Sequence, residues 1–103
     1  MAQWHLKDLR GALERHGWRF AQELPGDDYR ISATWTWVRS GRPPTELIID
    51  FDGLDDMHTL PIHESYGCQA RGTSHSLYFR RRREKWTEEL QAFVAAVGRD
   101  HAV

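Results

Sequence analysis

The sequence lacks the features that tie a chain together covalently or anchor it in a membrane. Its 103 residues include a single cysteine, Cys68, which cannot form an internal disulfide. The longest apolar run covers residues 92–97, far short of the about 20 apolar residues that a membrane-spanning helix requires. Residues 1–20 lack the apolar segment and the small-residue cleavage site of a secretory signal. These absences predict a cytoplasmic protein without a membrane partner.

A charge excess and catalytic motifs are also lacking. Fourteen basic and fifteen acidic residues give a formal net charge of −1. Such a balance produces no bulk field that attracts nucleic acid, so we do not expect a nucleic-acid partner. The sequence contains no P-loop, no Gly-x-Ser-x-Gly, no His-Glu-x-x-His and no dinucleotide fingerprint. We therefore assign no catalytic residue, no metal site and no cofactor.

Aromatic residues, by contrast, are plentiful. They make up 12% of the chain and include five tryptophans. The mean hydropathy is low at −0.69, a value that disordered chains share, but disordered chains are poor in aromatic residues. A chain of this length forms one domain and buries roughly 60 to 70% of its unfolded surface. We therefore expect a single folded domain over residues 1–103.

The segment 29–38 carries the strongest structural signal. Apolar side chains occupy every second position: Tyr29, Ile31, Ala33, Trp35 and Trp37. Polar side chains fill the positions between them: Arg30, Ser32, Thr34 and Thr36. Because successive side chains of a strand point to opposite faces, this pattern predicts a sheet with one covered apolar face and one bare polar face.

Similar periodicities place the other elements. A helix is predicted over residues 3–16, ended by Gly17, and a second helix with an apolar stripe over residues 84–97. Between them the patterns predict strands over residues 17–24, 29–39, 46–52, 66–70 and 75–81. Short connections favour antiparallel neighbours, because parallel pairs need long crossovers. The predicted fold class is α+β: a meander-like antiparallel sheet of four to five strands, with the N-terminal and C-terminal helices packed on one face.

Charge is distributed unevenly along the second half of the chain. Residues 43–70 contain no lysine or arginine, whereas residues 71–85 contain six: Arg71, Arg80, Arg81, Arg82, Arg83 and Lys85. Arginine holds anions through its planar fork, so Arg80 and Arg82 are candidate anion-binding residues. The favoured interpretation is a solvated edge, or pairing across the open face of the sheet with Asp50 and Asp52.

Two groups of residues invite a chemical interpretation. Residues 50–64 are rich in aspartate and histidine, which would suit a small metal-dependent enzyme, but their spacing matches no ligand pattern and a polar loop is favoured. Cys68 follows His63 and Glu64, and a nucleophilic cysteine needs a base close to it, so these three residues suggest a catalytic thiol. A lone cysteine in a strand is more often a small buried apolar residue, and this is the favoured interpretation.

The tryptophans offer a better lead. Packing in the core is their favoured role. The alternative is an aromatic-lined cleft between sheet and helices that binds a flat or cationic small molecule. The residues that would line this cleft and its rim are Trp35, Trp37, Tyr66, Cys68, Tyr78 and Trp86.

No motif names a reaction or a ligand. The first hypothesis is a non-enzymatic interaction domain that binds another protein, or a second copy of itself, through the open sheet face or an edge strand. The second is a small-molecule binder that uses the tryptophan-lined cleft. A small metal-dependent enzyme built on residues 50–64 comes third.

Overall fold

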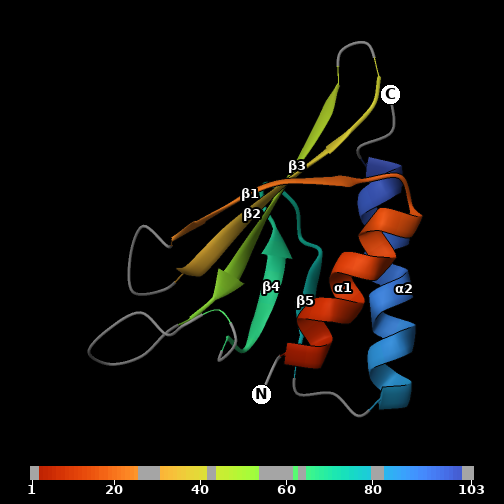
Figure 1. Cartoon of the computed structure of the whole chain (residues 1–103). Helices are drawn as coiled ribbons and strands as arrows, with labels where there is room; N and C mark the ends of the chain where they lie inside the picture. Colours follow the sequence, from red (N-terminus) through yellow and green to blue (C-terminus); the bar gives the residue numbers. More distant parts are fainter. Residues whose placement is uncertain are drawn as a thin grey trace.

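The computed structural model describes residues 3–25, 31–41, 44–53, 62, 65–79 and 83–100. The elements follow one another as helix, five strands and helix (Figure 1). They are α1 (Gln3–Arg15), β1 (Arg19–Pro25), β2 (Ile31–Arg39), β3 (Thr45–Asp52), β4 (Gly67–Ala70), β5 (Ser76–Tyr78) and α2 (Arg83–Asp100).

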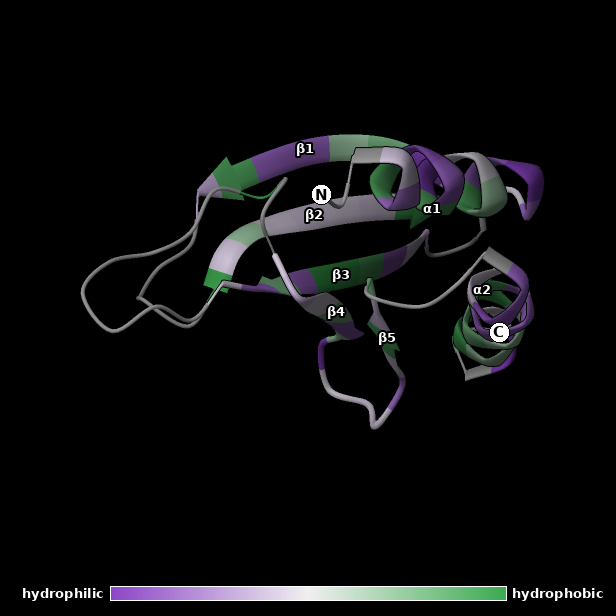
Figure 2. Cartoon of the chain, turned by 90° about the horizontal axis from the view of Figure 1, so that it is seen from below, coloured by the Kyte–Doolittle hydropathy of each residue, from purple (hydrophilic) through white to green (hydrophobic). Residues whose placement is uncertain are grey.

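The five strands form one antiparallel meander in the order β1-β2-β3-β4-β5. Both helices lie on the same side of this sheet (Figure 2). The predicted α+β fold class is therefore confirmed, with five strands. Among the strand boundaries that differ from the prediction, β1 extends past residue 24 to Pro25, and β5 covers three residues instead of seven.

The first helix ends where glycine permits a left-handed residue. Gly17 has a φ of +88°. Its N–H donates to the carbonyl of Glu14, and the N–H of Trp18 donates to the carbonyl of Leu13 at 3.0 Å. These two bonds form a Schellman motif, which satisfies carbonyls that the helix end would otherwise leave unpaired. The turn directs Trp18 into the core, where it is 1% exposed.

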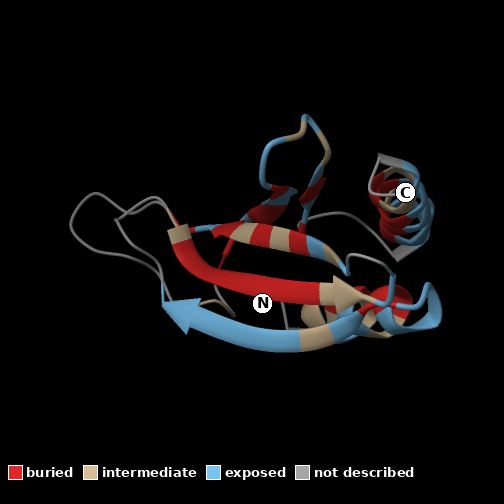
Figure 3. Cartoon of the chain, turned by 90° about the horizontal axis from the view of Figure 1, so that it is seen from above, coloured by how far each residue is buried: buried red, intermediate tan, exposed pale blue. Residues whose placement is uncertain are grey.

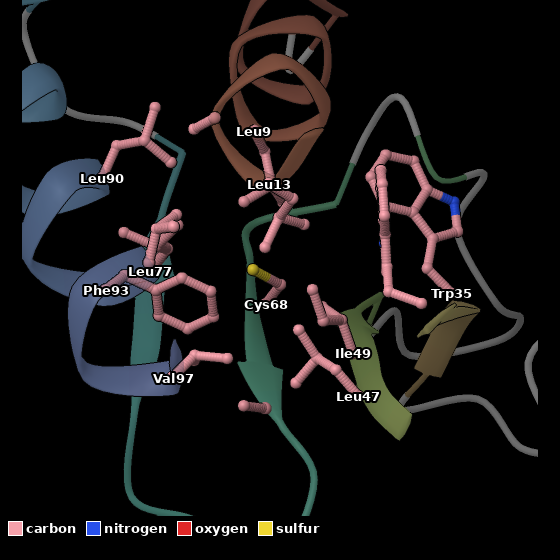
Figure 4. Packing of buried hydrophobic residues seen from close by; sticks show 14 of the residues in the cluster. Leu9, Leu13, Trp35, Leu47, Ile49, Cys68, Leu77, Leu90, Phe93 and Val97 are labelled. Carbon is pink, nitrogen blue, oxygen red and sulfur yellow. The ribbon is translucent and has the colours of Figure 1, made fainter. Parts of the chain in front are cut away.

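The core lies between the sheet and the two helices, as the alternation predicted. From the sheet it receives Ala33, Trp35, Trp37, Leu47, Ile49, Phe51, Cys68, Ala70 and Leu77. The apolar stripe of α2 packs against them, and Figure 4 shows Leu90, Phe93 and Val97 pointing toward Leu77 and Cys68. Full burial of each large apolar side chain stabilises the fold by roughly 1.5–3 kcal/mol.

Two polar contacts tie the helices in place. The indole Nε1 of Trp86 in α2 donates to Oδ2 of Asp8 in α1 at 3.0 Å. Near the C-terminus of α2, Nη2 of Arg39 donates to the carbonyl of Gly98 at 3.1 Å. The guanidinium of Arg39 also lies 4.3 Å from the ring centre of Trp18. The Arg39 contact places a cation at the C-terminus of α2, where the helix dipole favours it. Among the described residues, neither helix combines the length and apolarity needed to cross a membrane.

The expected bare polar face is wrong for β2. Ser32, Thr34 and Thr36 are each only 8% exposed. The reason is that β2 lies between β1 and β3, whose side chains on this face are longer than its own. Thr34, for example, lies between Leu24 and Asp50, and these larger side chains shield its small hydroxyl group from water. Figure 3 shows β2 buried along most of its length beside the exposed β1.

Candidate functional site

On the open face of the sheet, a polar network joins three of the described residues. Oδ1 of Asp50 accepts a hydrogen bond from the hydroxyl of Thr34 at 2.9 Å. Both carboxylate oxygens of Asp50 also accept from the guanidinium of Arg71, at 2.8 and 3.0 Å. This bidentate geometry is the strongest form of an arginine–carboxylate pair. Both carboxylate oxygens of Asp50 thus have hydrogen-bond partners within the protein, which assigns this residue a structural role.

The predicted pairing of Asp50 and Asp52 with Arg80 and Arg82 is wrong as a cross-strand contact. It required β3 and β5 to be neighbours, and β4 lies between them. Arg80 and Arg82 themselves lie outside the described residues, so their anion-binding role stays a prediction. Asp52 has a raised pKa, first because partial burial disfavours its charged form and second because Asp50 repels it.

The described part of the chain supports neither a reactive Cys68 nor a metal site. Cys68 is fully buried, and burial raises the pKa of its thiol, with the charge of Asp52 adding to the shift. A protonated, inaccessible thiol is a poor nucleophile, and this supports the structural interpretation of Cys68. Of the acidic and histidine residues of 50–64, only Asp50 and Asp52 are among the described residues. The described residues include no group of three such side chains that could hold a metal.

The six residues predicted to share a ligand cleft do not meet in one place. Trp37, Cys68 and Trp86 are at most 1% exposed and belong to the core. Tyr66 and Tyr78 are 39% and 57% exposed and lie outside the cleft next to Trp35. Of the six, Trp35 alone lines that cleft, which measures about 660 Å³ between α1 and the first two strands. The sequence pattern could not separate core from cleft tryptophans, because both alternate on the same strand face.

The walls of the Trp35 cleft carry both charge signs. Nε1 of Trp35 donates to Oε1 of Glu23 at 2.6 Å. The guanidinium of Arg10 lies 4.6 Å from the ring centre of Phe20 and 5.6 Å from that of Trp35. Arg10 thus covers the aromatic floor of the cleft, formed by the rings of Phe20 and Trp35. This explains why Trp35 is only 3% exposed. Gly11 also lines the cleft, and a Cβ placed on it would meet only the tip of the Arg15 side chain, at 3.2 Å.

A second hollow lies where the last strand meets the C-terminal helix. This β5–α2 groove has a volume of about 560 Å³. Its strand side is formed by Ser74, His75, Ser76 and Tyr78, and its helix side by Glu89, Ala92, Phe93, Ala96 and Arg99. Glu89, Ala92, Ala96 and Arg99 follow one another along α2 at spacings of three and four, beside the buried stripe to which Phe93 belongs. Two of them are alanines, which leave room between the helix and the strand.

The backbone of β5 is oriented by its pairing with β4. The carbonyl of His75 accepts from the N–H of Ala70, and the N–H of Phe79 donates to the carbonyl of Tyr66. In an antiparallel pair, successive residues direct their backbone groups alternately toward and away from the partner strand. The N–H and C=O of Ser76 therefore point outward, away from β4. Among the described residues, no strand lies beyond β5.

Sequence reasoning missed the β5–α2 groove as a site. The available signal was the pair of alanines at 92 and 96, one turn apart on α2. This signal does not show that the helix and the strand edge line the same hollow, because that depends on where α2 crosses the sheet.

Comparison with known proteins finds no matching family model, and no curated protein or solved structure has significant similarity to the chain.

Proposed function

We propose that this protein is a non-enzymatic protein-interaction module that binds an extended segment of a partner protein along the outer edge of β5. The segment adds a sixth strand to the sheet and places alternate side chains in the β5–α2 groove. The observation that carries this proposal is the outward-pointing backbone of Ser76 at the rim of a 560 Å³ groove. Strand addition obtains affinity from main-chain hydrogen bonds and specificity from the pockets beside them.

The opposite edge of the sheet is poorly suited to the same role. In β1 the register shifts between Phe20 and Gln22, which marks a bulge in the strand. The strand ends on Pro25, which has no N–H, and carries the charged side chains of Arg19 and Glu23. Bulges, prolines and charges are the devices by which edge strands resist pairing. Of the two edges, β5 is therefore the one available for a partner.

The dimensions of the groove suit a short extended segment. The helix residues Glu89 and Arg99 line it and are ten residues apart, which corresponds to about 15 Å along α2. An extended chain advances about 3.3 Å per residue, so about five residues span that distance. The groove volume also falls within the range of about 300–1,000 Å³ that is typical of ligand sites.

The proposal is tested with a capped peptide of sequence Lys-Thr-Val-Ser-Val-Thr-Glu, labelled with a fluorophore and titrated with the protein. We expect saturable binding and amide chemical-shift changes at Ser76 and along the groove side of α2. The variant Ser76→Pro removes the outward N–H but leaves the ladder bonds of His75 and Phe79 intact, so it should fold and lose binding. Ser76→Thr keeps the N–H and is the matched control.

Two results would contradict strand addition at β5. One is equal peptide binding by the proline and threonine variants when thermal melts show that both are folded. The other is a set of shift changes confined to β1 or to the open face. Sedimentation of the protein alone tests the related case in which a second copy occupies the edge, since dimerisation that Ser76→Pro abolishes would identify the chain itself as the partner.

A second candidate function is small-molecule binding in the Trp35 cleft. The observation that favours it is Gly11, which lies within α1 although glycine costs about 1 kcal/mol of helix propensity relative to alanine. No neighbouring backbone demands a glycine there, because a Cβ would touch only the end of Arg15. The missing side chain instead enlarges the cleft beside Arg10 and Trp35.

This second function is tested with the aromatic anion anilinonaphthalene sulfonate. Binding in the cleft should displace Arg10 from the aromatic floor, enhance the fluorescence of the dye and shift the methyl signals of Leu6 and Ile62. The variant Gly11→Leu fills the cleft and should abolish these changes. The matched control is Gly98→Ala, at a helical glycine that does not line the cleft, and it should leave them intact. Unchanged binding by the leucine variant would refute the assignment.

A further inference from the structure

The β5–α2 groove carries charges of opposite sign at its two ends. Glu89 and Arg99 both line it, and Arg99 is exposed. Between them lie Ala92 and Ala96, which bring no charge and little bulk. The side chains that line the groove therefore place a carboxylate at one end, two small apolar residues in the middle and a guanidinium at the other end. A bound segment meets these three regions in a fixed order.

The direction of β5 relative to these charges follows from the connection to α2. Residues 79–82 alone separate the strand from the helix, and the two elements pack against each other. Figure 1 shows them running in opposite directions. The start of β5, with Ser74 and His75, therefore lies at the Arg99 end of the groove. The end of β5, with Tyr78, lies toward Glu89.

We propose that the segment bound at this edge runs antiparallel to β5, with a basic group on its N-terminal side against Glu89 and a carboxylate on its C-terminal side against Arg99. This inference rests on the proposed function and specifies its partner. An antiparallel segment runs in the direction of α2, from Glu89 to Arg99. Antiparallel pairing extends the existing pattern of the sheet and is slightly more stable per residue than parallel pairing.

The side chains between the two charges are expected to be small and apolar. In an extended segment, every second side chain points to the same face, so two of about five residues turn toward Ala92 and Ala96. Valine or threonine fills such a space, whereas a large aromatic ring would meet the buried Phe93 below the alanines. The preferred segment is therefore basic, then alternating small apolar residues, then acidic.

The test compares two peptides of identical composition and opposite charge order. Lys-Thr-Val-Ser-Val-Thr-Glu and Glu-Thr-Val-Ser-Val-Thr-Lys, both acetylated and amidated, are titrated against the wild-type protein. Exchanging two attractions for two repulsions at exposed ion pairs should weaken binding about tenfold. The double variant Glu89→Lys with Arg99→Glu keeps the net charge and should prefer the second peptide.

Each outcome separates this inference from the proposed function. A basic-first preference that reverses in the double variant, and that shrinks at high salt, supports the inference. Equal binding of both peptides, lost in Ser76→Pro, overturns the inference and leaves strand addition at β5 standing. A wild-type preference for the acidic-first peptide also overturns it, because the segment would then run parallel. Binding of neither peptide overturns both proposals.

Discussion

Replacing Asp50 with alanine should destabilise the fold far more than replacing its partner Arg71. Loss of the carboxylate leaves the hydroxyl of Thr34 without its acceptor in a site where that residue is 8% exposed. An unsatisfied buried polar group costs about 1–3 kcal/mol. The pair with Arg71 adds less, because the arginine side chain is 50% exposed and such pairs contribute about 0.2–1 kcal/mol. We expect a loss of about 2 kcal/mol for Asp50→Ala and well under 1 kcal/mol for Arg71→Ala.

The comparison is made by urea unfolding, followed by tryptophan fluorescence. Thr34→Val removes the hydroxyl while keeping the shape of the side chain, so Asp50→Ala should cost about 1 kcal/mol less in that background than in the wild type. Equal losses for the Asp50 and Arg71 variants would refute the reasoning, since they would mean that the exposed ion pair, and not the buried hydroxyl, carries the energy. The reasoning would also be refuted if the losses caused by Asp50→Ala and Thr34→Val simply added in the double variant.

Three further results are expected. Alkylation of Cys68 by iodoacetamide should be far slower in the folded protein than in urea, because the thiol is buried and its pKa is raised; rapid labelling of the folded protein would contradict this placement. Asp52→Asn should raise the free energy of unfolding at neutral pH and have little effect at about pH 3. The pKa of Asp52 is raised in the folded state, so its charged form destabilises the fold, and at about pH 3 the carboxyl group is largely protonated. An effect that does not depend on pH would show that the charge of Asp52 is not responsible. Gly11→Ala should raise the melting temperature by several degrees, from about 1 kcal/mol of helix propensity, and a lower value would show that the helix needs a glycine there.

The parts of the fold that follow from local periodicity could be read from the sequence. The alternation around Trp35 and Trp37 predicted which face of β2 enters the core, and both residues are buried there. The stripe that ends at Val97 predicted the buried face of the C-terminal helix. Gly17 predicted the end of the first helix, because a left-handed residue is needed at that point.

The interactions that depend on which strands are neighbours could not be read in the same way. The alternation of side chains along the strand correctly predicted that Asp50 lies on the open face. It did not predict which basic residue of that face pairs with Asp50. The meander inserts β4 between β3 and β5, and the turn after β4 supplies Arg71. The same limit applies to burial: Thr34 is polar and faces away from the helices, yet its neighbours on both sides cover it.

The candidate site was the least predictable part. Aromatic content pointed to a tryptophan cleft, and the structure gives one to Trp35 while enclosing Trp37 and Trp86 in the core. The β5–α2 groove depends on the gap between a strand edge and a helix, which no residue pattern encodes. Its chemistry lies partly in backbone groups at Ser76, and these have no sequence signature.

Amide hydrogen exchange at Ser76, measured with and without the basic-first peptide, tests the central claim most directly. The outward N–H of an edge strand is open to water, so it should exchange rapidly in the free protein while the N–H of Phe79, which donates to Tyr66, is protected. Saturation with the peptide should slow exchange at Ser76 markedly and leave Phe79 little changed. Strong protection of the Ser76 amide in the free protein would contradict the account, because the edge of β5 would then already be covered.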